Sequence, residues 1–138
     1  LADDASGKFT DFEEDKEKVA GILKERGIWS VEFITTRNSQ EVLEEYAGYF
    51  YHQGFVVSFG TEHNTPAMEP VLLHSRGGNL LSDLLIDINY KGACVIAAHQ
   101  YLYATEGEGY LDSSGTPNTL SRSSFEELGN ALIHHIIR

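Results

Sequence analysis

Residues 28–60 constrain the fold more than any other part of this chain, because they switch from a strand-like pattern to a helix-like pattern and back. Residues 28–35 carry apolar side chains at strand spacing, and residues 55–59 are almost continuously apolar. Between them, apolar residues recur at helical spacing, and the helical pattern ends at Gly54. A nearly all-apolar strand is typical of a sheet covered on both faces. The pattern predicts an α/β fold built on a parallel strand–helix–strand unit.

Polar side chains follow both strands of this unit. Arg37 and Asn38 come after the first strand, and three polar residues in succession come after the second: Glu62, His63 and Asn64. Parallel strands end at the same edge of a sheet, and open α/β folds bind ligands there. A carboxylate, an imidazole and a carboxamide can bind a metal, transfer a proton or hold a sugar hydroxyl. We therefore expect one ligand-binding edge; the alternative is an ordinary strand-to-loop turn with these side chains in water.

Two capping patterns predict where helices begin. Thr10 with Glu13 forms a capping-box pattern, followed by an amphipathic segment that extends to about residue 26. Asn38 with Glu41 gives a similar signal for the helix between the two strands. Both predictions place a helix start at the capping residue.

The second half of the chain, residues 67–138, has mostly helical patterns. Residues 80–88 predict an amphipathic helix that ends at 89–92, where Asn, Tyr, Lys and Gly follow one another. Residues 93–104 are apolar on nearly all sides, which predicts a buried helix or strand.

A long polar segment separates these elements from a last helix. Residues 105–122 are rich in Gly, Ser and Glu, and loops of this length are usually functional or disordered. Ser123 with Glu126 predicts the start of a final helix. We expect residues 1–138 to be a single domain or a carboxyl-terminal fragment of a longer polypeptide, with an α/β unit at 10–66.

Composition excludes several classes of partner. The 138 residues include 21 acidic and 10 basic side chains, for a net charge of −11. No basic cluster is present to neutralise phosphates, so binding to a nucleic-acid backbone is not expected. Cys94 is the only cysteine, which excludes an intrachain disulfide and predicts a small core residue in a cytoplasmic protein. No apolar run is long enough for a membrane span.

Two further side chains are candidates for substrate binding. Arg76 lies in the glycine-bearing segment 75–79, which we expect to open a helix and so to suit a phosphate or carboxylate; a plain loop is the alternative. His99 lies in the most apolar stretch of the chain, where an imidazole needs partners. It is either a hydrogen-bonded core histidine or a pocket histidine that approaches the loop at Glu62.

Residues 20–70 resemble the last part of the PHP (polymerase and histidinol phosphatase) domain. The motifs are a Gly-hydrophobic-Glu strand and a later Gly-Ser-Asp-x-His-like signature, here Gly27-Ile28-Trp29-Ser30-Val31-Glu32 and Gly60-Thr61-Glu62-His63-Asn64-Thr65-Pro66. Glu62 stands at the family's Asp position and Asn64 at its His position, with His63 between them. The resemblance implies a distorted α/β barrel-like protein that holds two or three metal ions and hydrolyses phosphate esters. The family's early His-x-His signature is absent from this chain, which implies a carboxyl-terminal portion.

Three functions follow as hypotheses. In the first, the chain is part of a metal-dependent hydrolase of a phosphate ester. Glu62 and His63 would be catalytic, a divalent metal (Zn, Mn or Mg) would bind Glu62, His63 and Asn64, and the isolated chain would be inactive. The residues expected to bind the anionic or sugar-like substrate are Arg37, Asn38, Arg76 and His99.

The other two hypotheses need no metal. In the second, the same edge is a non-catalytic binding site for a sugar or sugar phosphate. In the third, the chain is a helical assembly domain that forms a homo-oligomer, or packs on the rest of its parent chain, through the final helix and the tyrosine-rich helix at 46–51.

Overall fold

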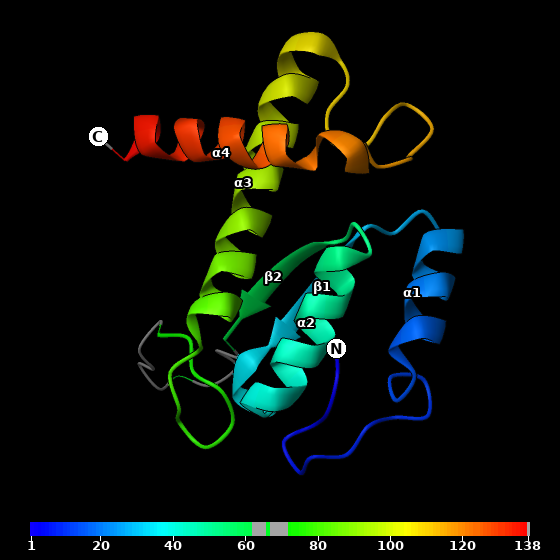
Figure 1. The fold of residues 1–138 in the computed structure, drawn as a ribbon, viewed down its shortest axis with the longest axis vertical. Coiled ribbons are helices and arrows are strands. Elements are labelled where there is room, and N and C mark those ends of the chain that lie inside the picture. The colour runs from blue at the N-terminus through cyan, green and yellow to red at the C-terminus, as the bar shows by residue number, and fades with distance from the viewer. Residues whose placement is uncertain (62–65, 67–71, 138) are drawn as a thin grey trace.

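The protein is described by a computed structural model that covers residues 1–61, 66 and 72–137. Within these residues the fold is mixed α/β, with four α-helices and one two-stranded parallel sheet (Figure 1). The helices are α1 (Lys16–Glu25), α2 (Gln40–His52), α3 (Asp83–Glu106) and α4 (Arg122–Ile136). The strands are β1 (Ser30–Ile34) and β2 (Val56–Gly60), and the 3₁₀ turns are η1 (Thr35–Arg37) and η2 (Thr119–Ser121).

The predicted strand–helix–strand unit is confirmed. β1 and β2 pair in parallel, from Ser30 opposite Val56 to Ile34 opposite Gly60, and α2 connects them. The two strands therefore end in register, at one edge of the sheet.

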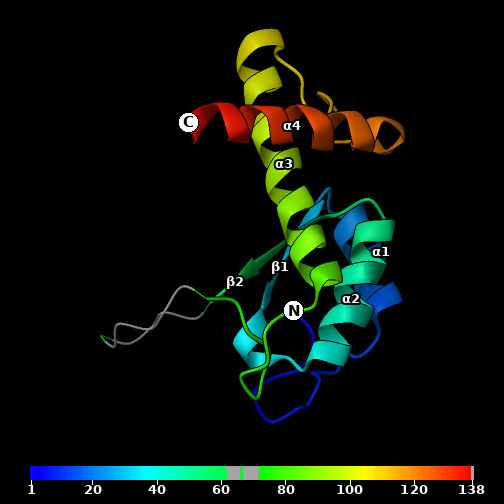
Figure 2. The ribbon, with the colours of Figure 1, turned by 60° about the vertical axis from the view of Figure 1, so that its left-hand side comes forward.

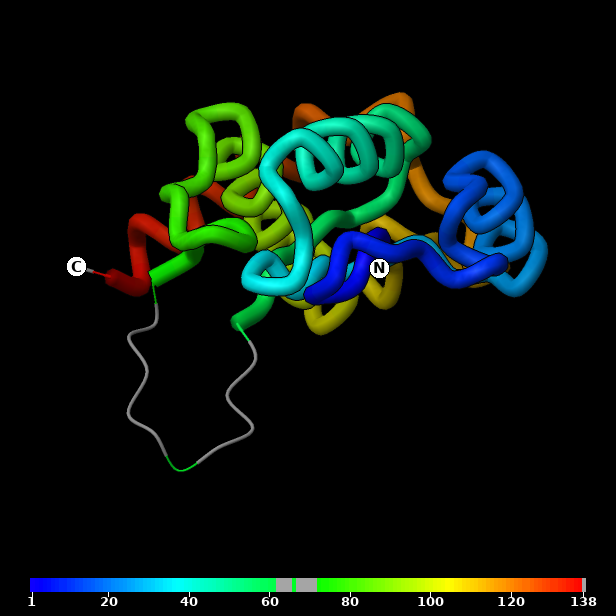
Figure 3. The backbone as a smooth tube through the Cα atoms, turned by 90° about the horizontal axis from the view of Figure 1, so that it is seen from below, coloured from blue at the N-terminus to red at the C-terminus, as the bar shows by residue number. Residues whose placement is uncertain are grey.

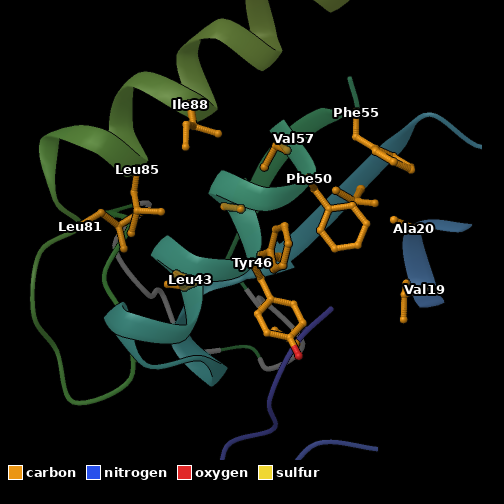
Figure 4. Packing of buried hydrophobic residues seen from close by; sticks show 14 residues of the cluster. Val19, Ala20, Leu43, Tyr46, Phe50, Phe55, Val57, Leu81, Leu85 and Ile88 are labelled. Carbon is orange, nitrogen blue, oxygen red and sulfur yellow. The ribbon is translucent and has the colours of Figure 1, made fainter. Parts of the chain in front are cut away.

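One face of the sheet packs against α2. Along β1, Val31 and Phe33 are buried, whereas Ser30 and Glu32 on the opposite face are exposed. The ring of Phe33 contacts Phe50 of α2 with 6.2 Å between centroids. Figure 4 shows how α2 places its apolar side chains between the sheet, α1 and the start of α3. Part of the opposite face of the sheet is therefore left uncovered by the described residues.

Helix α3 lies along the outer edge of β2. In a parallel pair of strands, every second residue directs its N–H and C=O groups away from the paired strand. The N–H of Val56 donates to the carbonyl of Trp29 across the pair, so the backbone groups of Val57 and Phe59 point away from β1. The N–H of Phe59 donates to Oδ1 of Asn89 at 2.8 Å, and Gly92 packs directly against the carbonyl of Val57.

The prediction that a helix ends at residues 89–92 is wrong, because α3 runs unbroken from Asp83 to Glu106. Gly92 lets the helix approach the strand closely, and Asn89 satisfies the strand's backbone. Residues 93–104, predicted to be either helix or strand, belong to the same helix.

We expect Asn89→Ala to lower the free energy of unfolding by about 1–3 kcal/mol, because the N–H of Phe59 would lose its partner in a partly buried position. Asn130 of α4 is the matched control, since it accepts from the hydroxyl of Tyr90 at an exposed site. Asn130→Ala should change stability by no more than about 0.5 kcal/mol. Urea unfolding of both variants measures the difference, and equal effects would mean that α3 does not protect the edge of β2.

The helix starts differ from those predicted. The Thr10–Glu13 pair forms, with the hydroxyl of Thr10 donating to the carboxylate of Glu13 at 2.8 Å, but it closes a turn ahead of the helix. The carboxylate of Asp15 accepts from the first N–H groups of α1. Helix α2 is capped by Ser39, so Asn38 is not its cap.

The segment between α3 and α4 is ordered by its own contacts. Gly107 ends α3 with a φ of 83°. The Asp112 carboxylate accepts hydrogen bonds from the N–H groups of Ser114 and Thr116. It also accepts one from the Ser114 hydroxyl, and this bond is the main reason that the pKa of the carboxyl is lowered. Helix α4 begins at Arg122, and its cap residue Ser121 makes no side-chain capping bond, so the predicted cap at Ser123 is wrong.

Helix α3 joins two apolar clusters. Its first half packs on the cluster around α2, and its second half packs on a smaller cluster of Val56, Val95, Ala98, Tyr110 and Phe125. Helix α4 crosses α3 in both ribbon views (Figure 2). Cys94 of α3 is buried, as expected for a small core residue, and burial raises the pKa of its thiol. None of the described helices is long and apolar enough to cross a membrane.

Candidate functional site

The ends of β1 and β2 bring together some of the residues predicted to form the ligand-binding edge. Thr35, Arg37 and Asn38 directly follow β1, and Thr61 follows Gly60 at the end of β2. Three of the predicted residues, Glu62, His63 and Asn64, lie outside the described residues. Their roles as metal ligands and catalytic groups stay predictions.

Glu32, the glutamate of the Gly27–Glu32 motif, also lies at this edge but was not among the predicted site residues. Its carboxylate lies directly over Gly60, so that a Cβ atom at position 60 would collide with Oε1 of Glu32. Gly60 does not have a positive φ. A Cβ atom at position 60 would therefore displace the flexible Glu32 side chain, with no backbone atom in its way. The sequence did carry a signal for the position of Glu32. Polar and apolar residues alternate along β1, and this alternation places Glu32 on the sheet face opposite α2.

Two buried oxygens lie immediately after β1. Oγ1 of Thr35 and Oδ1 of Asn38 have no hydrogen-bond partner among the described residues, although Thr35 is fully buried and Asn38 is 1% exposed. The amide of Asn38 donates to the carbonyl of Ile34 at 2.8 Å, which fixes its orientation. Buried acceptors are normally satisfied by protein, water or an ion. These two oxygens lie behind the predicted edge and are closed off from the surface.

Arg76 fastens the amino-terminal segment to this edge. Its NH1 donates to the carbonyls of Asp4 and Arg37 at 2.6 and 2.9 Å, and pairs with the buried carboxylate of Asp3 at 2.8 Å. Figure 3 shows the amino-terminal segment passing beside the turn that follows β1. The structure thus gives Arg76 a structural contact, and anion binding by this residue stays a prediction.

The sequence predicted that the segment around Arg76 opens a helix, and this prediction is wrong. It closes on itself, with the N–H of Ser75 donating to the carbonyl of Asn79 at 2.8 Å, and α3 begins only at Asp83. Because the helix start is several residues away, the expected combination of an arginine with free N–H groups at a helix start is absent from these described residues.

His99 is not at the edge with Arg37 and Asn38. It lines a pocket at the opposite ends of the strands, beside Ser30 and Val56. Its Nδ1 accepts a hydrogen bond from the N–H of Tyr110 at 3.0 Å, and its ring stacks on Tyr103. His99 thus has the hydrogen-bond partner expected of a core histidine, but it is only partly buried and lines a pocket at the amino ends of the strands. Its role in substrate binding stays a prediction.

No three His, Cys, Asp or Glu side chains among residues 1–61, 66 and 72–137 form a group that could hold a metal ion. Comparison with known proteins adds no assignment: no protein-family model matches the chain, and no curated protein or solved structure is detectably similar to it. Function is therefore inferred from the residues and their geometry.

Proposed function

We propose that the chain supplies the metal-binding and substrate-binding edge of a metal-dependent hydrolase that acts on a phosphate ester. The observation that carries the proposal is the carboxylate of Glu32, which lies over Gly60 where β1 and β2 end in register. Glu62 follows Gly60 by only two residues in the sequence. Carboxylate and imidazole ligands suit divalent metals such as Zn²⁺ and Mn²⁺.

The donors in this proposal come from both strands. Glu32 would contribute from β1, and Glu62, His63 and Asn64 from the sequence that follows β2. A bound metal would polarise a phosphoryl oxygen and lower the pKa of a bound water. Glu62 and His63 are the proposed catalytic residues. Arg37, which is exposed beside this edge, would hold the anionic part of the substrate.

The same proposal places β1 and β2 in a larger α/β barrel-like protein. Two-stranded sheets are marginally stable alone. Ser30 and Glu32 are exposed on the sheet face opposite α2, so that part of this face is free to meet further strands or side chains of a larger protein. In a barrel, that face would line the interior, where the strand ends deliver catalytic side chains.

Calorimetric titration of Mn²⁺ into the chain tests the proposal. We expect saturable binding that Glu32→Gln and Glu62→Ala each weaken at least about tenfold, or about 1.4 kcal/mol. Gly60→Ala should also weaken binding, because it displaces the Glu32 carboxylate without removing a donor. Glu25→Gln, at an exposed position on α1, is the control and should bind like the wild type.

Absence of Mn²⁺ binding, or binding that Glu32→Gln leaves unchanged, would refute a metal site at this edge. The second candidate is a sugar-phosphate-binding domain without metal, at the same edge. Titration of glucose 6-phosphate in the presence of EDTA distinguishes it. The assembly hypothesis stays a prediction; the hydroxyls of Tyr46 and Tyr51 bond within the chain, whereas Ile136 at the end of the final helix is exposed.

A further inference from the structure

A second candidate site is the pocket at the amino ends of β1 and β2, away from the proposed metal edge. It has a volume of about 430 Å³, within the range of small-molecule sites. Its walls come from the segment that leads into β1, from β1, β2 and α3, and from the loop before α4, and they are mostly apolar. The lining includes Trp29, Val56, Val95, Ile96, His99 and Tyr110.

The deep walls of the pocket are fixed by packing. Val56, Val95 and Tyr110 belong to the second apolar cluster, and each is at least nine-tenths buried. The hydroxyl of Tyr110 donates to the carbonyl of Gly54 at 2.8 Å in a buried position, and its ring contacts Phe125. The pocket is thus largely formed before any ligand binds.

His99 supplies a hydrogen-bond donor to a mostly apolar lining, which also includes Ser30. Because Nδ1 accepts from the N–H of Tyr110, the ring proton of the neutral imidazole is on Nε2. No hydrogen bond from Nε2 is present among the residues that the structure describes. The backbone at Gly109 packs so closely on His99 that a Cβ there would collide with its ring. The donor is therefore held in place by the fold.

We propose that this pocket binds a small aromatic molecule that carries one anionic or neutral hydrogen-bond acceptor. Trp29 and Tyr110 give the lining an aromatic character that favours a ring, through offset or edge-to-face contacts. Nε2 of His99 would donate to the acceptor of the ligand. This inference does not depend on the metal edge, since no residue of the pocket belongs to that edge.

Trp29 makes the proposal directly measurable, because it is the only tryptophan of the chain and lines the pocket. The probe is 8-anilinonaphthalene-1-sulfonate, an aromatic molecule with an acidic acceptor group. We expect saturable energy transfer from Trp29 to the bound probe. Ile96→Phe, at the half-exposed rim of the pocket, should weaken binding about tenfold by filling the space.

Ile86→Phe is the matched control, because Ile86 is also an exposed isoleucine of α3 but does not line the pocket. It should leave binding unchanged. Absence of energy transfer, or equal weakening by both variants, would overturn the proposal and indicate non-specific adsorption to apolar surface.

The role of His99 is tested with N-phenyl-1-naphthylamine, which has the same rings but lacks the sulfonate. We expect the wild type to prefer the sulfonate probe by about fivefold to tenfold, the value of one hydrogen bond. His99→Ala should abolish that preference and retain binding of the uncharged probe. A preference that survives in His99→Ala, or loss of both probes, would contradict the donor role.

Discussion

Gly129→Ala is expected to lower the free energy of unfolding by about 2–3 kcal/mol, although alanine is normally the better helix former. Helix α4 crosses α3 at this residue, and a Cβ atom there would collide with the backbone of Cys94, including its carbonyl oxygen. Backbone atoms cannot rotate away as a side chain can. The methyl group must therefore push the two helices apart and loosen the cluster that contains Phe125.

Gly92→Ala is expected to act in the same direction at a different interface. A Cβ atom at Gly92 would collide with the carbonyl of Val57, so α3 would have to move away from the edge of β2. That movement would also lengthen the bond from Phe59 to Asn89. The two glycines should therefore be similarly intolerant of alanine.

The chain contains its own controls for these substitutions. Gly21 of α1 and Gly48 of α2 are also helical, but a Cβ atom at either position meets nothing within 4 Å. Alanine at either position should stabilise the protein by about 0.5–1 kcal/mol, through helix propensity and reduced freedom of the unfolded chain. Urea unfolding of the four variants gives the signs. If Gly129→Ala stabilised the protein as Gly48→Ala does, α4 would not cross α3 as described.

These glycines show why sequence patterns predicted the strand–helix–strand unit but not the second half. The spacing of apolar residues along the strands and the glycine at position 54 are local signals in the sequence. Both have their counterparts in the structure, as the alternating burial of β1 and the positive φ of Gly54. Gly92 follows Asn, Tyr and Lys, which locally resembles a helix end. Its actual role depends on Val57, which lies far away in the sequence. No pattern within a single segment carries that information.

The candidate site divides in the same way. The shared edge of the two strands was predictable, because parallel pairing follows from the connecting helix. The partners of Arg76 were not, since its contact to Asp4 spans 72 residues. The contact of Glu32 with Gly60 depends on the strand register, which the sequence did not specify. The pocket of His99 needed the position of Tyr110, on a loop that carried no pattern.

Arg122→Met is expected to cost about 3 kcal/mol of stability, because Arg122 ties the start of α4 to the α/β unit through buried contacts. Its NH1 donates to the carbonyls of Tyr51 and Phe55 at 3.2 and 2.9 Å, and its Nε pairs with Glu126 at 2.9 Å. The guanidinium also lies 4.1 Å from the centroid of the Tyr51 ring. Methionine preserves much of the apolar stem but leaves the Glu126 carboxylate, 16% exposed, without its cation.

The pair of Asp87 and Lys91 is the matched control, because it has the same i,i+4 spacing on α3 but is more exposed, at 53% and 36%. Lys91→Met should change stability by less than about 1 kcal/mol, since water already screens that pair. Guanidinium chloride would screen both pairs, so urea unfolding is the appropriate measurement. A double-mutant cycle of Arg122→Met with Glu126→Gln should give a coupling energy of at least about 1 kcal/mol. A coupling near zero would mean that the two side chains do not pair, and Arg122 would then anchor α4 only through its bonds to the carbonyls of Tyr51 and Phe55 and its contact with the Tyr51 ring.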